Sequence, residues 1–281
     1  MTATAPRRNL VAYILHTFFV QAWARIDARD RGQIRVGNVS ARTAAVITAV
    51  TASLMLVTLR FVVMDQQVQA RLAAATVDAA FALDYGLGVW LTPYAPLLDN
   101  LSWVLGCVLC YVIIPAGVVR IVFGLTLSEF YMAPRDYAKH LPIYALLFLP
   151  VALSVIGVAQ SPEFQMHYPF HTSRVGVGGQ LVWELGYGIQ FFALEFFFRG
   201  FLLRGLAADM GASAILAMSI PYCMIHFGKP LPECLGSILA GTVLGTLAMD
   251  TRSIWGGVTI HVAVAWLMDG AALWLKAKGH A

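Results

Sequence analysis

Long apolar runs separated by short polar connections dominate the chain from about residue 44 onward. A membrane-spanning helix needs roughly 20 apolar residues, and backbone groups in lipid must be satisfied within the segment itself. The pattern therefore predicts an all-α, polytopic membrane helical bundle. About seven spans are expected, of which the fifth and sixth are short: Ala44 to Met64, Leu101 to Val119, Leu141 to Ala159, Gly178 to Leu202, Ala212 to Phe227, Leu235 to Met249 and Ile254 to Leu275.

Two further segments are expected to lie outside these spans. Leu10 to Trp23 is apolar with polar interruptions and precedes an arginine cluster, which is typical of an interfacial amphipathic helix. The stretch from Arg71 to Leu98 predicts a peripheral helix followed by a loop, or a segment that dips into the bilayer. The chain is thus divided into an interfacial segment (1–43), amino-terminal spans with a peripheral loop (44–177) and a carboxy-terminal core (178–281).

Composition and charge fit this membrane setting. Of 281 residues, 59% are hydrophobic and 12% are charged, whereas soluble domains carry about 25% charged residues. The net charge of +4 arises mainly from an amino-terminal excess of arginine, which indicates contact with anionic lipid head groups rather than with nucleic acid. Basic residues fall on alternate connections, so the amino terminus is predicted to be cytoplasmic, in a bacterial inner membrane, although Lys276 and Lys278 then lie outside.

The four cysteines do not predict a disulfide framework, because all of them lie in or beside apolar segments. Cys107 and Cys110 form a C-x-x-C pattern within a predicted span. A redox or metal role is one interpretation of this pattern, and packing is the preferred one.

Ionisable residues within the spans are concentrated in the carboxy-terminal half. Such side chains are costly in lipid unless they are paired or hydrated, so they are candidates for a functional site. Glu195 and Arg199 are four residues apart on one predicted helix and can pair, either as a structural ion pair or as part of a site. His226 ends an apolar run and His261 lies deep in the last span, where a neutral imidazole needs a partner. We expect Glu195, His226 and His261 to lie within about 8 Å of one another in one hydrated cavity.

The order and spacing of these residues resemble a known family. The run Leu194-Glu195-Phe196-Phe197-Phe198-Arg199-Gly200 is followed by Tyr222-x-x-x-His226, Gly241-x-x-x-Gly245 and His261. This set is similar to the CPBP family, which comprises CAAX prenyl proteases and bacteriocin-processing or self-immunity proteins. The family pattern is E-E-x-x-x-R, then F-x-x-x-H, then H-x-x-x-N or a relative of it. The resemblance covers about a third of the chain, from Gly178 to Asp269, and implies that Glu195, Arg199, His226 and His261 are the site residues.

Three positions depart from the family pattern. Leu194 stands where the family has its first glutamate, the residue usually assigned to activating water, and Ala265 stands where a polar residue often follows the last histidine. Tyr222 replaces phenylalanine, which is a conservative change by side-chain shape. A carboxylate one residue later points about 100° around the helix, so Glu195 can replace the missing base only if the helix is rotated or distorted there.

The resemblance implies an intramembrane peptidase, with Glu195 as general base for a water held by His226 and His261. The two imidazoles would either bind a divalent metal such as zinc together with Glu195, as in a metalloprotease, or stabilise the oxyanion without a metal. The implied partners are membrane lipids and a peptide or lipidated-protein substrate. Two other functions remain open: a catalytically silent scaffold or immunity-type binding protein of the same fold, which Leu194 favours, and a transporter or proton pathway, which does not explain the motif spacing.

Overall fold

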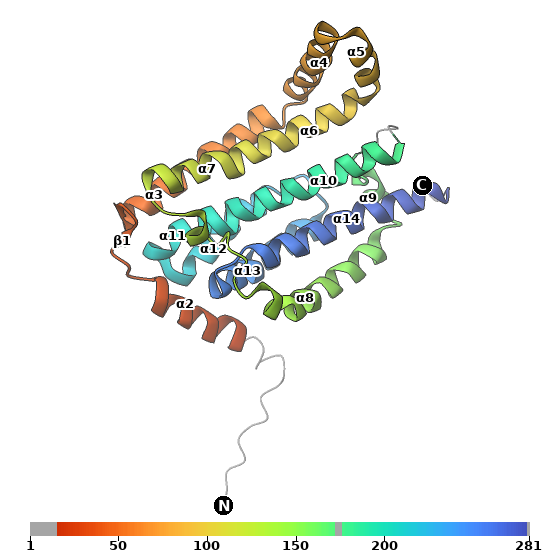
Figure 1. The fold of residues 1–281 in the computed structure, drawn as a ribbon. Helices are drawn as coiled ribbons and strands as arrows, with labels where there is room; N and C mark the ends of the chain where they lie inside the picture. Colours follow the sequence, from red (N-terminus) through yellow and green to blue (C-terminus); the bar gives the residue numbers. More distant parts are fainter. Residues whose placement is uncertain (1–15, 172–175, 280–281) are drawn as a thin grey trace, which may run out of the picture.

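The computed structural model describes residues 16–171 and 176–279, and it consists almost entirely of helices (Figure 1). Within this described part, six helical stretches are long and apolar enough to cross a membrane: Ala41–Val63, Tyr85–Val122, Tyr137–Val158, Gly176–Met224, Leu231–Thr251 and Trp255–Ala277. The all-α polytopic fold predicted from hydropathy is confirmed, and the chain is an integral membrane protein.

The elements follow one another along the chain with short connections. Their bounds are η1 (His16–Gln21), α2 (Ala22–Asp30), β1 (Arg35–Val36), β2 (Val39–Ser40), α3 (Ala41–Thr58), η2 (Leu59–Val63), α4 (Gln66–Leu83), α5 (Tyr85–Leu91), η3 (Thr92–Tyr94), α6 (Ala95–Val108), η4 (Leu109–Ile113), α7 (Ile114–Gly117), η5 (Val118–Val122), η6 (Leu127–Phe130), α8 (Tyr137–Val158), α9 (Pro162–His167), α10 (Gly176–Glu195), η7 (Phe196–Leu202), α11 (Leu203–Met210), η8 (Gly211–Ser213), α12 (Ala214–Met224), α13 (Leu231–Thr251) and α14 (Trp255–Ala277). The strands β1 and β2 form a short antiparallel hairpin before the first span.

The longest stretch, Gly176–Met224, is broken at Gly211. This glycine has a φ of +59°, a conformation that side-chain-bearing residues rarely adopt, and it ends α11 before α12 begins. The fifth predicted span, Ala212 to Phe227, is therefore α12, a helix of only 11 residues. At 1.5 Å per residue it is about 16 Å long, which is shorter than the hydrocarbon core.

The amino-terminal helix extends further than expected. The part described begins at His16, so residues 10–15 of the predicted segment lie outside the described residues, and the helix continues past Trp23 to Asp30. It packs on α13, where Trp23 Nε1 donates to Thr246 Oγ1 (3.0 Å) and Arg29 donates to the carbonyl oxygen of Met249 (2.6 Å). Part of the arginine cluster thus lies within this helix and anchors it to the bundle.

The peripheral helix expected at the start of Arg71 to Leu98 is part of α4, whereas the loop expected after it is also helical. The helices α4 and α5 form a hairpin in which α4 packs against α6 (Figure 1). Asp84 starts α5 by accepting a hydrogen bond from the backbone N–H of Leu87 (2.8 Å). A segment rich in Gly, Pro and Tyr can thus form a helix when an aspartate caps its first turn.

Connections rich in basic residues gather at one end of the bundle. The side chain of Asp27 accepts a hydrogen bond from the backbone N–H of Ala212 (2.7 Å), Arg25 pairs with Asp250 (2.8 Å), and Arg252 lies 3.7 Å from Asp30. The carboxy-terminal end of α14 lies at the opposite end (Figure 1). The positive-inside rule predicts that this end of the bundle is cytoplasmic.

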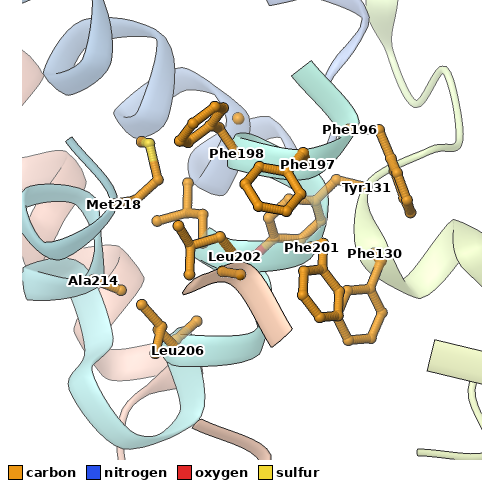
Figure 2. Close-up of a cluster of buried hydrophobic side chains, with 14 of the residues drawn as sticks. Phe130, Tyr131, Phe196, Phe197, Phe198, Phe201, Leu202, Leu206, Ala214 and Met218 are labelled. Atoms are coloured by element: carbon orange, nitrogen blue, oxygen red, sulfur yellow. The ribbon is translucent and has the colours of Figure 1, made fainter. Parts of the chain in front are cut away.

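The π-helical segment η7 lies in the centre of the core. All seven of its residues are buried, and its phenylalanines pack with Phe130 and Tyr131 and with residues of α11 and α12 (Figure 2). Because η7 follows directly after Glu195 and contains Arg199, this packing fixes both charged side chains in the interior.

The topology can be tested by single-cysteine labelling in a background without the four native cysteines. Cysteines at Asn38 and Arg252 should react with a membrane-impermeant maleimide from one side of the membrane, and a cysteine at Lys278 from the other. In inverted and right-side-out vesicles, we expect the first two positions on the cytoplasmic side. Labelling of all three positions from the same side would contradict this arrangement.

Candidate active site

Glu195 and Arg199 form a buried ion pair at the junction of α10 and η7. Arg199 Nη1 lies 3.1 Å from Glu195 Oε1, and both side chains are 0% exposed. A buried charge without a partner would cost several kcal/mol, so the pairing is needed for both residues to occupy the core.

His261 on α14 contacts the same carboxylate. Its Nδ1 lies 2.6 Å from Glu195 Oε1, and its ring stacks on Phe191 with centroids 5.7 Å apart and planes 5° apart. Glu195 therefore lies between a guanidinium and an imidazole. Because a carboxylate next to Nδ1 favours a proton on that nitrogen, the lone pair of a neutral His261 ring is on Nε2.

Gly257 makes room for the carboxylate against the backbone of α14. A Cβ built on this glycine would lie 2.1 Å from Glu195 Oε2, which is far inside van der Waals contact. Gly257 lies one helical turn before His261, so the two positions share a face of α14. Sequence reasoning missed this residue, and the only signal was a glycine four positions before the histidine.

Tyr222 of α12 joins the two histidines. Its hydroxyl lies 2.8 Å from His261 Nε2, and the guanidinium of Arg199 lies over its ring at 4.0 Å from the centroid. Treating Tyr222 as a conservative replacement of phenylalanine was wrong, because the added oxygen makes a polar contact with a candidate site residue.

His226 is held in the turn that follows α12. Its Nδ1 lies 2.8 Å from the carbonyl oxygen of Tyr222, and its ring packs edge-on against the Tyr222 ring with centroids 4.9 Å apart. A carbonyl can only accept, so Nδ1 donates and Nε2 of a neutral ring has a free lone pair. The structure thus brings Glu195, Arg199 and His261 together directly and connects His226 to them through Tyr222.

A cavity of about 440 Å³ has both histidines and Tyr222 in its wall. Apolar residues of α8, α10, α13 and α14 make up much of the remaining wall, together with Lys229, Glu233 and Tyr168. Burial, reinforced by the Glu233 carboxylate, raises the pKa of Tyr168, so its hydroxyl keeps its proton and donates to Glu233 (3.2 Å). Glu195 is fully buried and is not part of this wall, so it lies behind His261 as seen from the cavity.

Comparison with known proteins gives one match. Residues 181–267 match the family model described as type II CAAX prenyl endopeptidase, Rce1-like. Over this third of the chain the protein is therefore similar to CAAX proteases of the CPBP family. The matched segment includes Glu195, Arg199, Tyr222, His226 and His261, and neither a curated protein nor a solved structure matches the chain.

The position of the first family glutamate is filled by a packed leucine. Leu194 is 6% exposed and belongs to the main hydrophobic core. It follows Tyr187 and Phe191 by seven and three residues, so it lies on the face of α10 that these two residues present to the cavity. A CPBP protein with glutamate at this position would have a carboxylate directly beyond the cavity wall, whereas this chain has an apolar group there.

The proposed metal ligands are not assembled as a metal site. No group of three His, Cys, Asp or Glu side chains suited to holding a metal ion occurs among residues 16–171 and 176–279. His261 has one ring nitrogen against Glu195 and the other against Tyr222, so neither is open to a metal in this arrangement. The donor set does not fit a zinc centre formed by Glu195, His226 and His261.

Two other carboxylates of the spans, Glu184 and Asp269, form hydrogen bonds away from Glu195 and the two histidines. Glu184 accepts a hydrogen bond from Gln180 (2.7 Å). Asp269 is 0% exposed and accepts hydrogen bonds from the backbone N–H of Phe170 (3.0 Å) and from Trp183 Nε1 (3.1 Å). These contacts fix the connection before α10 against α14 and do not place either carboxylate on the histidines.

Removal of Arg199 should destabilise the fold. Arg199→Ala leaves the Glu195 carboxylate buried with His261 as its remaining partner, and we expect a loss of about 3–5 kcal/mol. Thermal unfolding of the purified protein in detergent measures this loss. Arg25→Ala is the matched control, because its ion pair with Asp250 is exposed to solvent and should be worth at most about 1 kcal/mol. Equal losses in the two variants would contradict the interpretation of Glu195 and Arg199 as a buried pair.

Gly257→Ala should displace the Glu195 carboxylate. The added methyl group overlaps Oε2, so we expect a loss of about 1–3 kcal/mol from overpacking, together with loss of any activity that depends on His261. Gly270→Ala on the same helix is the control, since a Cβ at that position meets nothing within 4 Å. Differential scanning fluorimetry compares the two variants, and an undisturbed Gly257→Ala protein would show that the close approach is not required.

Proposed function

We propose that this chain is an intramembrane peptidase of the CAAX-protease type that hydrolyses a peptide bond in the cavity formed by α8, α10, α12, α13 and α14. The observation that carries the proposal is the presence of both family histidines in the wall of one cavity, with a buried carboxylate behind one of them. The substrate is a peptide or a lipidated protein tail presented at the membrane, and a prenylated CAAX end is one option that the family offers.

In this proposal His226 is the base. Its free Nε2 removes a proton from a water molecule as the water oxygen bonds to the scissile carbonyl carbon. The proton then passes to the amine nitrogen as the carbon–nitrogen bond breaks, which regenerates the neutral ring.

Glu195 has a different role from that expected from the sequence. Because it is fully buried and does not reach the cavity, it acts through His261, whose ring it orients. Such a carboxylate behind a histidine contributes strongly to catalysis without touching the substrate. Glu195 is therefore proposed as a positioning residue rather than as the base that contacts water.

The second candidate function is a catalytically silent binding protein that keeps the family fold. Leu194 favours it, because an apolar side chain occupies the position of the glutamate usually assigned to water activation. Under this alternative the cavity binds a peptide segment without cleaving it, and the hydrogen-bonded side chains serve stability alone.

Activity measurements on the purified protein in lipid vesicles separate the two functions. The probes are a farnesylated peptide ending in a CAAX sequence and a set of unlipidated membrane-anchored peptides, with products identified by mass spectrometry. We expect His226→Ala and Glu195→Gln each to reduce kcat by about 10³-fold or more without unfolding the protein. His140→Ala is the control, since its Nδ1 contacts only a carbonyl oxygen of its own helix. We also expect 1,10-phenanthroline to leave the rate unchanged.

Two results would overturn this proposal. Cleavage by His226→Ala at the rate of the unmodified protein would remove His226 from the mechanism. No cleavage by the unmodified protein, combined with cleavage after Leu194→Glu, would favour the silent binding protein, because the restored carboxylate would then be the only missing component.

A further inference from the structure

The hydroxyl group of Tyr222 has no counterpart in the family pattern, which has phenylalanine at this position. Resting on the peptidase function proposed above, we infer that the Tyr222 hydroxyl is the hydrogen-bond donor that stabilises the oxyanion formed when water attacks the scissile carbonyl. Tyr222 would then be a catalytic residue of this chain in its own right.

The placement of the hydroxyl supports this role. It contacts His261 Nε2 at 2.8 Å, and the Tyr222 ring centroid lies 4.9 Å from that of His226 and 6.2 Å from that of His261. The residue is 1% exposed and lines the cavity. A carbonyl group bound next to His226 would therefore meet a donor that is itself almost fully buried, where a hydrogen bond to a developing charge is strong.

The contact with His261 Nε2 sets the direction of the Tyr222 hydroxyl proton in the absence of a bound peptide. When the His261 ring is neutral, Nε2 accepts and the hydroxyl donates to it. A carbonyl oxygen that gains negative charge is a stronger acceptor than a neutral ring nitrogen, so the O–H turns from Nε2 to the oxyanion. The Arg199 cation over the Tyr222 ring withdraws electron density and strengthens the O–H as a donor.

Three of the other hydroxyl groups of the cavity wall donate to fixed acceptors. They are Ser154, which donates to the Pro150 carbonyl (2.9 Å), Ser237, which donates to the Cys234 carbonyl (2.7 Å), and Tyr168, which donates to Glu233 (3.2 Å). The Tyr222 hydroxyl differs because its partner is a ring nitrogen of His261, a candidate site residue that also lines the cavity. Ala265, which lines the same cavity, provides no polar group.

The reaction step requires no co-reactant beyond water. The water oxygen bonds to the carbonyl carbon, the carbonyl π electrons move to the oxygen, and the Tyr222 O–H donates a hydrogen bond to that oxyanion without giving up its proton. As the intermediate collapses, the carbonyl re-forms, the carbon–nitrogen bond breaks, and the leaving amine takes the proton held by His226.

Tyr222→Phe tests the inference, because it removes one oxygen atom and keeps the ring under Arg199. With the farnesylated peptide in vesicles, we expect kcat to fall by about 10²-fold, while KM and the unfolding temperature stay within error of the unmodified protein. Tyr144→Phe is the matched control, since Tyr144 is a buried tyrosine that packs against Gly256 outside the cavity wall. An unchanged kcat for Tyr222→Phe would overturn the inference while leaving the peptidase function intact.

A binding measurement tests the role of Tyr222 without requiring that the peptide be cleaved. A phosphinate analogue of the same peptide has a tetrahedral anionic group in place of the scissile amide, and the matched amide peptide does not. We expect the unmodified protein to bind the phosphinate more tightly, and Tyr222→Phe to lose that preference by about 10²-fold with unchanged binding of the amide. Equal phosphinate binding by both proteins would overturn the role of Tyr222. A protein that neither cleaves nor prefers the phosphinate would overturn the peptidase function as well.

Discussion

The arrangement of the carboxy-terminal core depends on one constraint, the burial of the Glu195 carboxylate in the interior of a membrane protein. A carboxylate with 0% exposure must be neutralised where it lies, because bulk water cannot reach it. Arg199 supplies the opposite charge one turn along the same helix, and Gly257 opens the space on α14 that the carboxylate occupies. The close contact between Gly257 and the Glu195 carboxylate therefore fixes the position at which α10 and α14 cross.

The surroundings of this charge cluster strengthen its interactions. The η7 segment surrounds Arg199 with phenylalanines that are 0% exposed, and Phe191 covers one face of the His261 ring. An apolar environment weakens screening, so each contact between charged and polar groups is stronger than it would be at a surface. The same environment makes the loss of a partner costly, because solvent cannot replace the missing hydrogen bond to a buried polar atom.

Local patterns in the sequence predicted the parts of this structure that depend on residues close together in the chain. Hydropathy located the spanning helices, and the four-residue spacing of Glu195 and Arg199 predicted their pairing. Contacts between distant segments could not be predicted in the same way. Neither the space at Gly257 nor the contact of the Tyr222 hydroxyl with His261 follows from one segment alone, since each depends on how two helices approach. Hydropathy also separated the fourth span from the fifth, and the structure places the break at Gly211, directly before the predicted start of the fifth span.

The same geometry bears on whether the site is a structural ion pair or a reactive one. Arg199 alone neutralises Glu195, so a purely structural role would not require a histidine on the same carboxylate. His261 nevertheless contacts Glu195 on one ring nitrogen and Tyr222 on the other, and it forms part of the cavity wall. The carboxylate and the hydroxyl together fix the orientation of the imidazole toward the cavity. Packing of the helices does not require that orientation, whereas the proposed peptidase site depends on it.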